Sequence, residues 1–260
     1  MTARAAPAWW GNAAFLTSFV FLIAAWQLSG LFLNKIFIST PSAIVTAFAE
    51  ILGDGTLIRK FADSALDMGV GIVIASVLGI GLGVLMGRSP RMERAFEPIV
   101  NFANATPTIA LLPLMEIWFG LGMAARVSFI VIISVWTLLI NTLTGIKNVR
   151  AGHRDVARSF GMTRIQATRS VYVPAAMPFI LAGLRIALAQ AAVGMILSGQ
   201  EIGEFGLGGL TQQYATFYQT AHLIATILSS TALAMLAFAA LRIYQAMRHP
   251  WIAATAAGRR

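Results

Sequence analysis

Long apolar stretches, separated by short polar segments, dominate the chain. A helix of about 20 mostly apolar residues is long enough to cross a bilayer. Six stretches meet this requirement, so the pattern predicts an all-α integral membrane protein with six transmembrane helices. The expected spans are residues 13–33, 68–86, 99–121, 127–146, 175–197 and 223–241.

The composition supports this class and argues against others. Hydrophobic residues make up 58% of the chain and charged residues only 11%, far from the balance of a soluble domain. The chain has no cysteine and its three histidines are widely scattered, so we expect no metal site and no bound cofactor. In so apolar a chain, a net charge of +9 indicates basic loops facing an anionic membrane surface rather than a nucleic-acid partner.

The positions of the basic residues predict the orientation, because Lys and Arg near span ends are retained on the cytoplasmic side. With an even number of spans, both ends of the chain share a side. Placing both termini in the cytoplasm puts fourteen basic residues inside and four outside, with Arg185 within a span. The inner set is Arg4, Arg88, Arg91, Arg94, Lys147, Arg150, Arg154, Arg158, Arg164, Arg169, Arg242, Arg248, Arg259 and Arg260, and the outer set is Lys35, Arg59, Lys60 and Arg126.

Three parts of the chain are expected. Residues 1–62 hold a retained anchor span and an outer amphipathic helix, capped by Ser39 or Ser42, that lies on the membrane interface. Residues 63–250 form the core, and residues 251–260 form a short cytoplasmic tail. The apolar face of the outer helix comprises Ile44, Val45, Phe48 and Ile51.

Two of the spans carry residues that shape helix packing. Gly79, Gly83 and Gly87 recur at four-residue spacing in the second span, which lets another helix backbone approach closely. Pro107 and Pro113 lie in the third span, where proline frees carbonyl groups and bends a helix. We expect tight packing for the second span and a bent, cavity-lining helix for the third.

A compact cationic segment interrupts the apolar sequence at residues 150–173, which we call the knuckle. A short helix is expected to end at Gly161, because glycine supplies the left-handed turn that helix ends favour. Thr163 then caps a second short helix, with Gln166 at capping-box spacing, and Pro174 ends that helix before the fifth span. A loop that needed only positive charge would not require these signals, so their order favours a docking surface.

The knuckle also keeps a fixed spacing of residues at Asp155, Val156, Ala157, Gly161, Val171, Val173 and Pro174. This spacing resembles the cytoplasmic motif of binding-protein-dependent ABC importer permeases, E-A-A-x3-G-x9-I-x-L-P, with mild replacements. Weaker agreement covers most of the chain, through "STPSAIVTAF", "GLGVLMGRSPRMERAFEPIV", "LLPLMEIWFGLG" and "GLRIAL". These stretches are similar to the corresponding sequences of the permease subgroup that includes nitrate, sulfonate and taurine importers.

The resemblance implies a pore-forming subunit that works as a homodimer in the bacterial inner membrane. Two cytoplasmic ATPase subunits would bind ATP and Mg and grip the knuckle, and an extracytoplasmic binding protein would deliver a small solute. The chain itself is expected not to be an enzyme, since it lacks the G-x4-G-K-[ST] phosphate loop. The implied coupling residues are Asp155, Val156, Ala157, Arg158, Phe160, Gly161, Thr163, Arg164 and Pro174.

Charged and amide side chains near the spans are candidates for the translocation path or its gate, because charges within a membrane are costly. Arg185 lies near mid-membrane, where it either pairs with a backbone carbonyl or carboxylate or contacts the solute. Glu116 either lines the path or pairs with a residue such as Arg126. Asp67, Glu116, Glu201 and Glu204 would make the outer mouth acidic. The candidate path residues are Glu116, Arg185, Glu201, Glu204 and Asn104.

An ion-coupled secondary transporter is the alternative function. It would need coupling carboxylates, or broken helices related by an internal repeat. Glu116 and Arg185 are a small set for this purpose, and the two halves show no convincing repeat. A membrane enzyme would need a catalytic cluster, and the sequence has no cysteine and no H-E-x-x-H motif.

Overall fold

Four long helices form the body of the protein. The computed structural model describes residues 8–30 and 38–248, and these residues form helices and turns without a strand. The long helices are α3 (Thr56–Arg88), α6 (Met123–Lys147), α9 (Val173–Glu201) and α11 (Thr220–Arg248). The expected tail at 251–260 and the basic residues Arg4, Lys35, Arg259 and Arg260 lie outside the described residues.

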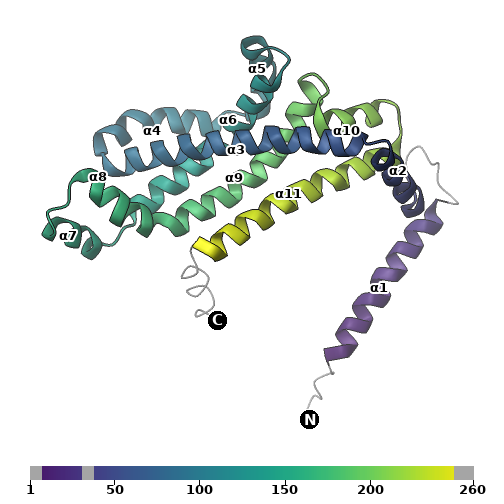
Figure 1. Ribbon diagram of the computed structural model, residues 1–260, viewed down its shortest axis with the longest axis horizontal. Coiled ribbons are helices and arrows are strands. Elements are labelled where there is room, and N and C mark those ends of the chain that lie inside the picture. The colour runs from purple at the N-terminus through teal and green to yellow at the C-terminus, as the bar shows by residue number, and fades with distance from the viewer. Residues whose placement is uncertain (1–7, 31–37, 249–260) are drawn as a thin grey trace.

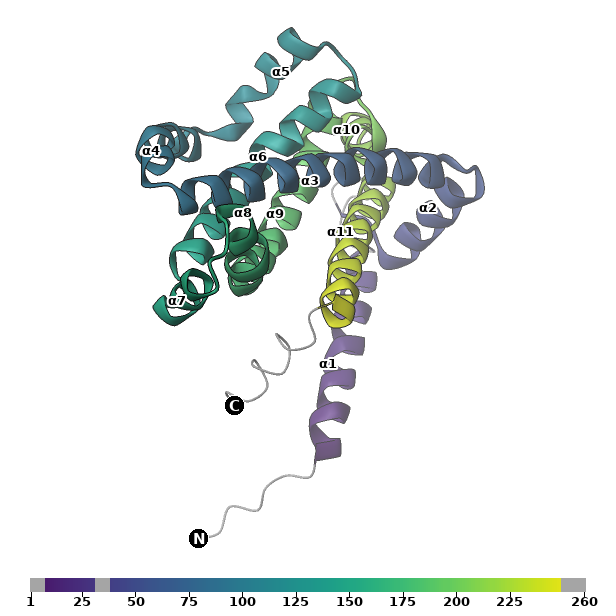
Figure 2. The same cartoon turned by 60° about the vertical axis from the view of Figure 1, so that its left-hand side comes forward.

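Two pairs of short helices lie at the ends of this body (Figure 1). One end carries α7 (Ala151–Ser159) and α8 (Arg164–Ala167), and the other carries α2 (Pro41–Gly53) and α10 (Gly206–Thr216). We refer to them as the α7/α8 end and the α2/α10 end. The most extensive packing joins α3 to α6 and α6 to α9. The first helix, α1 (Ala8–Ser29), projects away from the body and contacts α2 (Figures 1 and 2).

The glycines of α3 confirm the predicted close packing. A Cβ atom added to Gly79 would lie 2.8 Å from the carbonyl oxygen of Val135, and one added to Gly83 would lie 2.8 Å from that of Leu139. A Cβ atom added to Gly87 would lie 2.6 Å from Cγ2 of Ile146. The bare face of α3 therefore lets the backbone of α6 approach to a distance that any side chain would prevent.

The predicted third span is not one helix. Residues 90–119 form α4 (Pro90–Ala105), the 3-10 turn η1 (Thr108–Leu111) and α5 (Leu112–Phe119). The break follows from Pro107, because the residue before a proline is driven out of the helical region, and Thr106 has an extended ψ of 128°. Among the described residues, four helices are long and apolar enough to cross a membrane. These are α3, α6, α11 and the continuous helix Arg164–Glu201.

The N-cap of helix α2 is neither of the two predicted residues. Thr40 is its N-cap and accepts a hydrogen bond from the Ala43 N–H, whereas the Ser42 side chain is bonded to Gln27 of α1. The predicted apolar face is also divided. Ile44 and Ile51 are buried in the cluster that includes Leu233 of α11, while Val45 and Phe48 are exposed. Part of this face therefore packs on the protein rather than on the membrane interface.

The turn from α2 into α3 comes earlier than the expected boundary at residue 63, which falls inside α3. Gly55 adopts a positive φ of 74°, and the Thr56 N–H donates a hydrogen bond of 2.8 Å to the Asp54 carboxylate. That bond lowers the pKa of the Asp54 carboxyl group.

Candidate functional site

The turn between α7 and α8 confirms the predicted role of Gly161. Its φ is +62°, and a Cβ there would meet nothing within 4 Å, so the backbone angle alone requires glycine. The Gly161 N–H donates to the Arg158 carbonyl at 2.9 Å, and the Met162 N–H donates to the Ala157 carbonyl at 3.1 Å. These two bonds form a complete Schellman motif, which satisfies the last carbonyl groups of α7.

The start of α8 confirms the predicted capping box. The Gln166 N–H donates to Thr163 Oγ1 at 3.3 Å, and the Thr163 N–H donates to Gln166 Oε1 at 2.9 Å. The two side chains thus satisfy both backbone donors at the turn. Together with the Schellman motif, they set the angle between α7 and α8 through local bonds.

Pro174 does not end a helix, contrary to the prediction. Helix α8 continues through the π-helical turn η2 (Thr168–Tyr172) into α9, giving one helix over Arg164–Glu201. In the π turn the Val173 N–H donates to the Thr168 carbonyl, five residues back. This wider turn changes the backbone hydrogen-bond pattern just before Pro174. Pro174 has no N–H, so it could not have continued the ordinary α-helical pattern of hydrogen bonds. The helix is about 57 Å long at 1.5 Å per residue.

The knuckle presents an apolar surface with a charged rim. Val156, Phe160 and Ile165 are 50%, 76% and 75% exposed, whereas Ala157 is buried. Asp155, Arg158 and Arg164 are exposed around these apolar side chains. Three large apolar side chains held this far into solvent by a rigid turn are typical of a protein-docking surface.

Arg88 joins the knuckle to the body, a role that the sequence did not reveal. Its Nε donates a hydrogen bond of 3.1 Å to Thr168 Oγ1. Its guanidinium also lies 3.7 Å from the centre of the Tyr172 ring, as a cation–π contact. Both partners belong to η2, so the C-terminal end of α3 holds the π turn directly.

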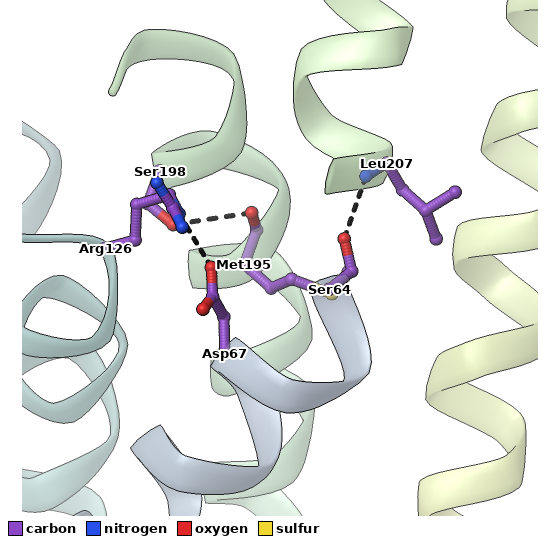
Figure 3. A network of polar contacts seen from close by, with 6 residues as sticks. All are labelled: Ser64, Asp67, Arg126, Met195, Ser198 and Leu207. Atoms are coloured by element: carbon purple, nitrogen blue, oxygen red, sulfur yellow. Dashed lines mark hydrogen bonds and ion pairs between the residues drawn. The ribbon is translucent and has the colours of Figure 1, made fainter. Parts of the chain in front are cut away.

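A buried ion pair organises the α2/α10 end (Figure 3). Arg126 Nε lies 2.7 Å from Asp67 Oδ2, and both side chains are almost fully buried. The guanidinium of Arg126 also lies 3.7 Å from the centre of the Phe205 ring. One turn from Asp67, Ser64 Oγ accepts a 2.8 Å hydrogen bond from the Leu207 N–H. These contacts join α3 and α6 to the start of α10.

The loop between α9 and α10 is tightly folded. Gly203, Glu204 and Gly206 all have positive φ angles, and the Phe205 N–H donates to the Gly199 carbonyl at 2.8 Å. A Cβ on Gly208 would lie 2.3 Å from the carbonyl oxygen of Ile196, which leaves no room for any other residue there. The glycine-rich sequence is therefore needed for close backbone packing.

The carboxylates of the predicted acidic mouth lie in different surroundings. Asp67 is neutralised by Arg126, and the proposed pairing of Glu116 with Arg126 is wrong for the same reason. Glu201, the last residue of α9, and Glu204, in the α9–α10 loop, are exposed, and Ile202 packs in one cluster with Met115 of α5. Glu116 therefore lies on an element that packs against this loop. Asn104 is exposed near the end of α4.

Arg185 lies midway along α9 and is exposed. Its Nη2 donates a hydrogen bond of 2.8 Å to the Gln245 side chain of α11. The partner within the chain is thus an amide, not the predicted backbone carbonyl or carboxylate. Within the ranges 8–30 and 38–248, no group of three metal-ligating side chains comes together.

Comparison with known proteins decides the family. The sequence pattern of the family described as "binding-protein-dependent transport system inner membrane component" matches residues 71–252. The chain belongs to this family. Such permeases are the membrane subunits of ABC importers, so the resemblance seen in the knuckle is confirmed.

Individual permeases are similar over most of their length. The taurine transport system permease protein TauC of Escherichia coli is 29% identical, over 93% of this chain and 88% of that protein. The formylaminopyrimidine transport permease protein ThiX of Halalkalibacterium halodurans is 28% identical, over 90% of this chain and 93% of that protein. The putative aliphatic sulfonates transport permease protein SsuC of Bacillus subtilis is 30% identical, over 80% of this chain and 76% of that protein. The predicted likeness to the nitrate, sulfonate and taurine subgroup is thereby confirmed.

A solved structure shares the fold of this permease. A chain of the MetNI methionine ABC transporter, in inward-facing conformations, aligns with a TM-score of 0.61 and 22% identity. The alignment covers 73% of the present chain and 95% of that one. The helical arrangement is therefore that of ABC importer membrane subunits.

Proposed function

We propose that the chain is the pore-forming subunit of an ATP-driven importer in the bacterial inner membrane. As a homodimer, it moves a small solute from an extracytoplasmic binding protein to the cytoplasm by alternating access. The observation that carries this proposal is the knuckle, a rigid and exposed apolar surface fixed to one end of a continuous membrane helix. Two cytoplasmic ATPase subunits, which hold ATP and Mg, dock on this surface.

The helix Arg164–Glu201 gives the proposal a mechanical basis. It begins in the knuckle and ends at the α9–α10 loop, so one rigid element joins the docking surface to the opposite end of the protein. A displacement of the knuckle would therefore be transmitted to this loop, whose Phe205 ring lies against the Arg126 guanidinium. We propose that this loop, with Glu201 and Glu204, is the gate.

The coupling residues take distinct parts in this scheme. Val156, Phe160 and Ile165 supply the apolar contact area, while Asp155, Arg158 and Arg164 supply charged contacts at its rim. Ala157 is buried beneath the surface and supports it. Gly161 and Thr163 set the shape of the turn, and Pro174 follows the π turn where the knuckle joins α9.

Reconstitution separates this function from that of a secondary transporter. Vesicles containing the permease, its ATPase subunits and its binding protein should accumulate the solute only when ATP is supplied on the cytoplasmic side. Omitting the ATPase should abolish uptake. Uptake driven by an ion gradient alone, without the ATPase, would contradict the proposal and favour the ion-coupled alternative.

The docking surface has its own test. The double variant Val156→Asp, Phe160→Asp places two carboxylates in the apolar patch and should abolish co-purification of the ATPase. Phe217→Asp is the matched control, because Phe217 is also an exposed aromatic residue but lies at the α2/α10 end. Loss of the ATPase from both variants, or from neither, would contradict docking at the knuckle.

A further inference from the structure

An arginine-lined cavity lies between the knuckle and α3. It has a volume of about 650 Å³ and is bounded by the C-terminal part of α3, the turn into α4, and the α8–η2 segment. Figure 2 shows these elements together at one end of the body. Four arginines line it, each from a different element, namely Arg88 of α3, Arg91 of α4, Arg164 of α8 and Arg169 of η2.

Within residues 8–30 and 38–248, no acidic side chain lines the cavity to neutralise this charge. The acidic residues of α4 and α7 at this end are Glu93, Glu97 and Asp155, and none of them lines the cavity. Glu93 is bound to Lys147. Within the described ranges, the side chains of Arg91 and Arg169 form no ion pair. Four guanidinium groups around one cavity repel one another, so the site favours an anion.

The remaining wall of the cavity is apolar. Gly81, Val84 and Leu85 of α3 contribute to it, and Ile165 closes it from α8. Gly81 lies seven residues before Arg88, so the wall extends about 10 Å from the charged end toward the middle of the helix. The cavity therefore combines a cationic mouth with an apolar channel along a membrane-spanning helix.

We propose that this cavity binds an anionic phospholipid of the phosphatidylglycerol type. The phosphodiester lies among the four arginines, and one acyl chain follows α3 past Leu85 to Gly81. Basic pockets at the ends of membrane helices bind such headgroups, because guanidinium and phosphate pair strongly at the membrane surface. The bound lipid would link α3 and α4 to α8, and so hold the knuckle against the bilayer.

Two other occupants fit the cavity less well. A second copy of the chain would present the same excess of arginines at this end. It has too few acidic residues there to pair with the arginines of the cavity. A water-soluble ATPase subunit could meet the arginines but would not extend along an apolar wall inside a membrane span. The cavity shares Arg164 and Ile165 with the edge of the ATPase surface but does not include Val156 or Phe160, so the variant that alters those two residues leaves the lipid site intact.

Competitive lipid binding tests the proposal. The full chain, purified in detergent, is mixed with equal amounts of dioleoylphosphatidylglycerol and dioleoylphosphatidylcholine, and the bound lipids are quantified by native mass spectrometry. The wild type should prefer phosphatidylglycerol. The variant Arg91→Gln, Arg169→Gln should reduce this preference about 30-fold, equivalent to about 2 kcal/mol for two basic residues.

The matched control removes the same charge elsewhere. Arg242→Gln, Arg248→Gln alters two exposed arginines of α11 that do not line the cavity, and should keep the wild-type preference. Equal loss in both double variants would mean that only net charge matters, and would overturn the site. No preference in the wild type would overturn it as well.

A third variant distinguishes a lipid from a free phosphate ion. Gly81 lines the cavity and a Cβ there would meet nothing within 4 Å, so Gly81→Phe is designed to fill the apolar channel. This variant should lose bound phosphatidylglycerol while its arginines remain intact. If Gly81→Phe binds the lipid normally and inorganic phosphate displaces it, the site is one for a soluble anion and the lipid assignment fails.

Discussion

The two ends of the protein are built in opposite ways. At the α7/α8 end, the turn between the two helices is shaped by bonds between residues at most five positions apart, and its large apolar side chains are exposed. At the α2/α10 end, the Asp67–Arg126 pair joins residues 59 positions apart, and both side chains are buried. A docking surface that must hold its own shape in solvent relies on local bonds. A region that closes around packed helices depends on contacts across the fold.

The largest effect is expected from breaking the ion pair. Asp67→Ala leaves Arg126 buried without its carboxylate, and removing one partner of a buried pair costs about 3–5 kcal/mol. Equilibrium unfolding in mixed micelles should show this loss. Arg126→Met added to Asp67→Ala should recover most of it, because no buried charge then remains.

Asp63→Ala is the control for that experiment. Asp63 lies one turn before Asp67 on α3, is only partly buried, and forms no ion pair with any residue in the described ranges. Its removal should change the free energy of unfolding by less than about 0.5 kcal/mol. A similar loss in both variants would mean that the buried pair does not dominate the stability of this end.

The packing of α3 on α6, which joins the two ends, gives the next largest effect. Gly79→Ala inserts a Cβ atom 2.7 Å from Leu138 Cβ and 2.8 Å from the Val135 oxygen, so overpacking should cost about 1–3 kcal/mol. Gly81→Ala, on the same helix with open space around it, should be neutral or stabilise by up to about 1 kcal/mol. Equal destabilisation by the two substitutions would contradict the proposed helix contact.

A smaller and more local effect is expected at the knuckle. Thr163→Ala removes the cap of α8 and should destabilise that turn by about 1 kcal/mol. Hydrogen exchange at the Gln166 amide should accelerate, while exchange in α3 and α6 stays unchanged. The control Ser159→Ala alters an exposed residue at the end of α7 and should leave the Gln166 amide protected. Faster exchange throughout the protein would show that the knuckle is not held locally.

The smallest effect concerns the partly exposed pair Lys147–Glu93. Such pairs contribute about 0.2–1 kcal/mol and are screened by salt. Glu93→Gln should therefore lower stability slightly at low ionic strength and not at all at high ionic strength. Glu97→Gln, which breaks no ion pair among the described residues, should show neither effect. A salt-independent loss in Glu93→Gln would indicate a packing role for this side chain.

The same contrast explains which features could be predicted from the sequence. Gly161, Thr163 and Gln166 were correctly assigned, because their signals act within one or two helical turns. The glycines of α3 were also interpreted correctly, since their periodicity marks one helix face without requiring knowledge of the partner helix.

Features that depend on the whole fold were not predictable. Asp67 and Arg126 were each recognised as charges near span ends, yet nothing in the sequence indicated that they meet. The effect of a proline was equally context-dependent: Pro107 breaks the predicted third span, whereas the helix passes through Pro174 because a π turn precedes it. The contact of Arg88 with Tyr172 also joins residues far apart in sequence, and no local motif marks it.

Co-purification of the ATPase with a Gly161→Leu variant tests the docking role of the knuckle most directly. The substitution strains a backbone with φ of +62° and should change the angle between α7 and α8. The control Gly55→Leu introduces the same strain, at φ of +74° with open space, at the opposite end. Gly161→Leu should lose the ATPase and keep its thermal midpoint within a few degrees, while Gly55→Leu retains the ATPase. Unchanged co-purification of Gly161→Leu would contradict the claim that the shape of the knuckle couples this permease to its ATPase.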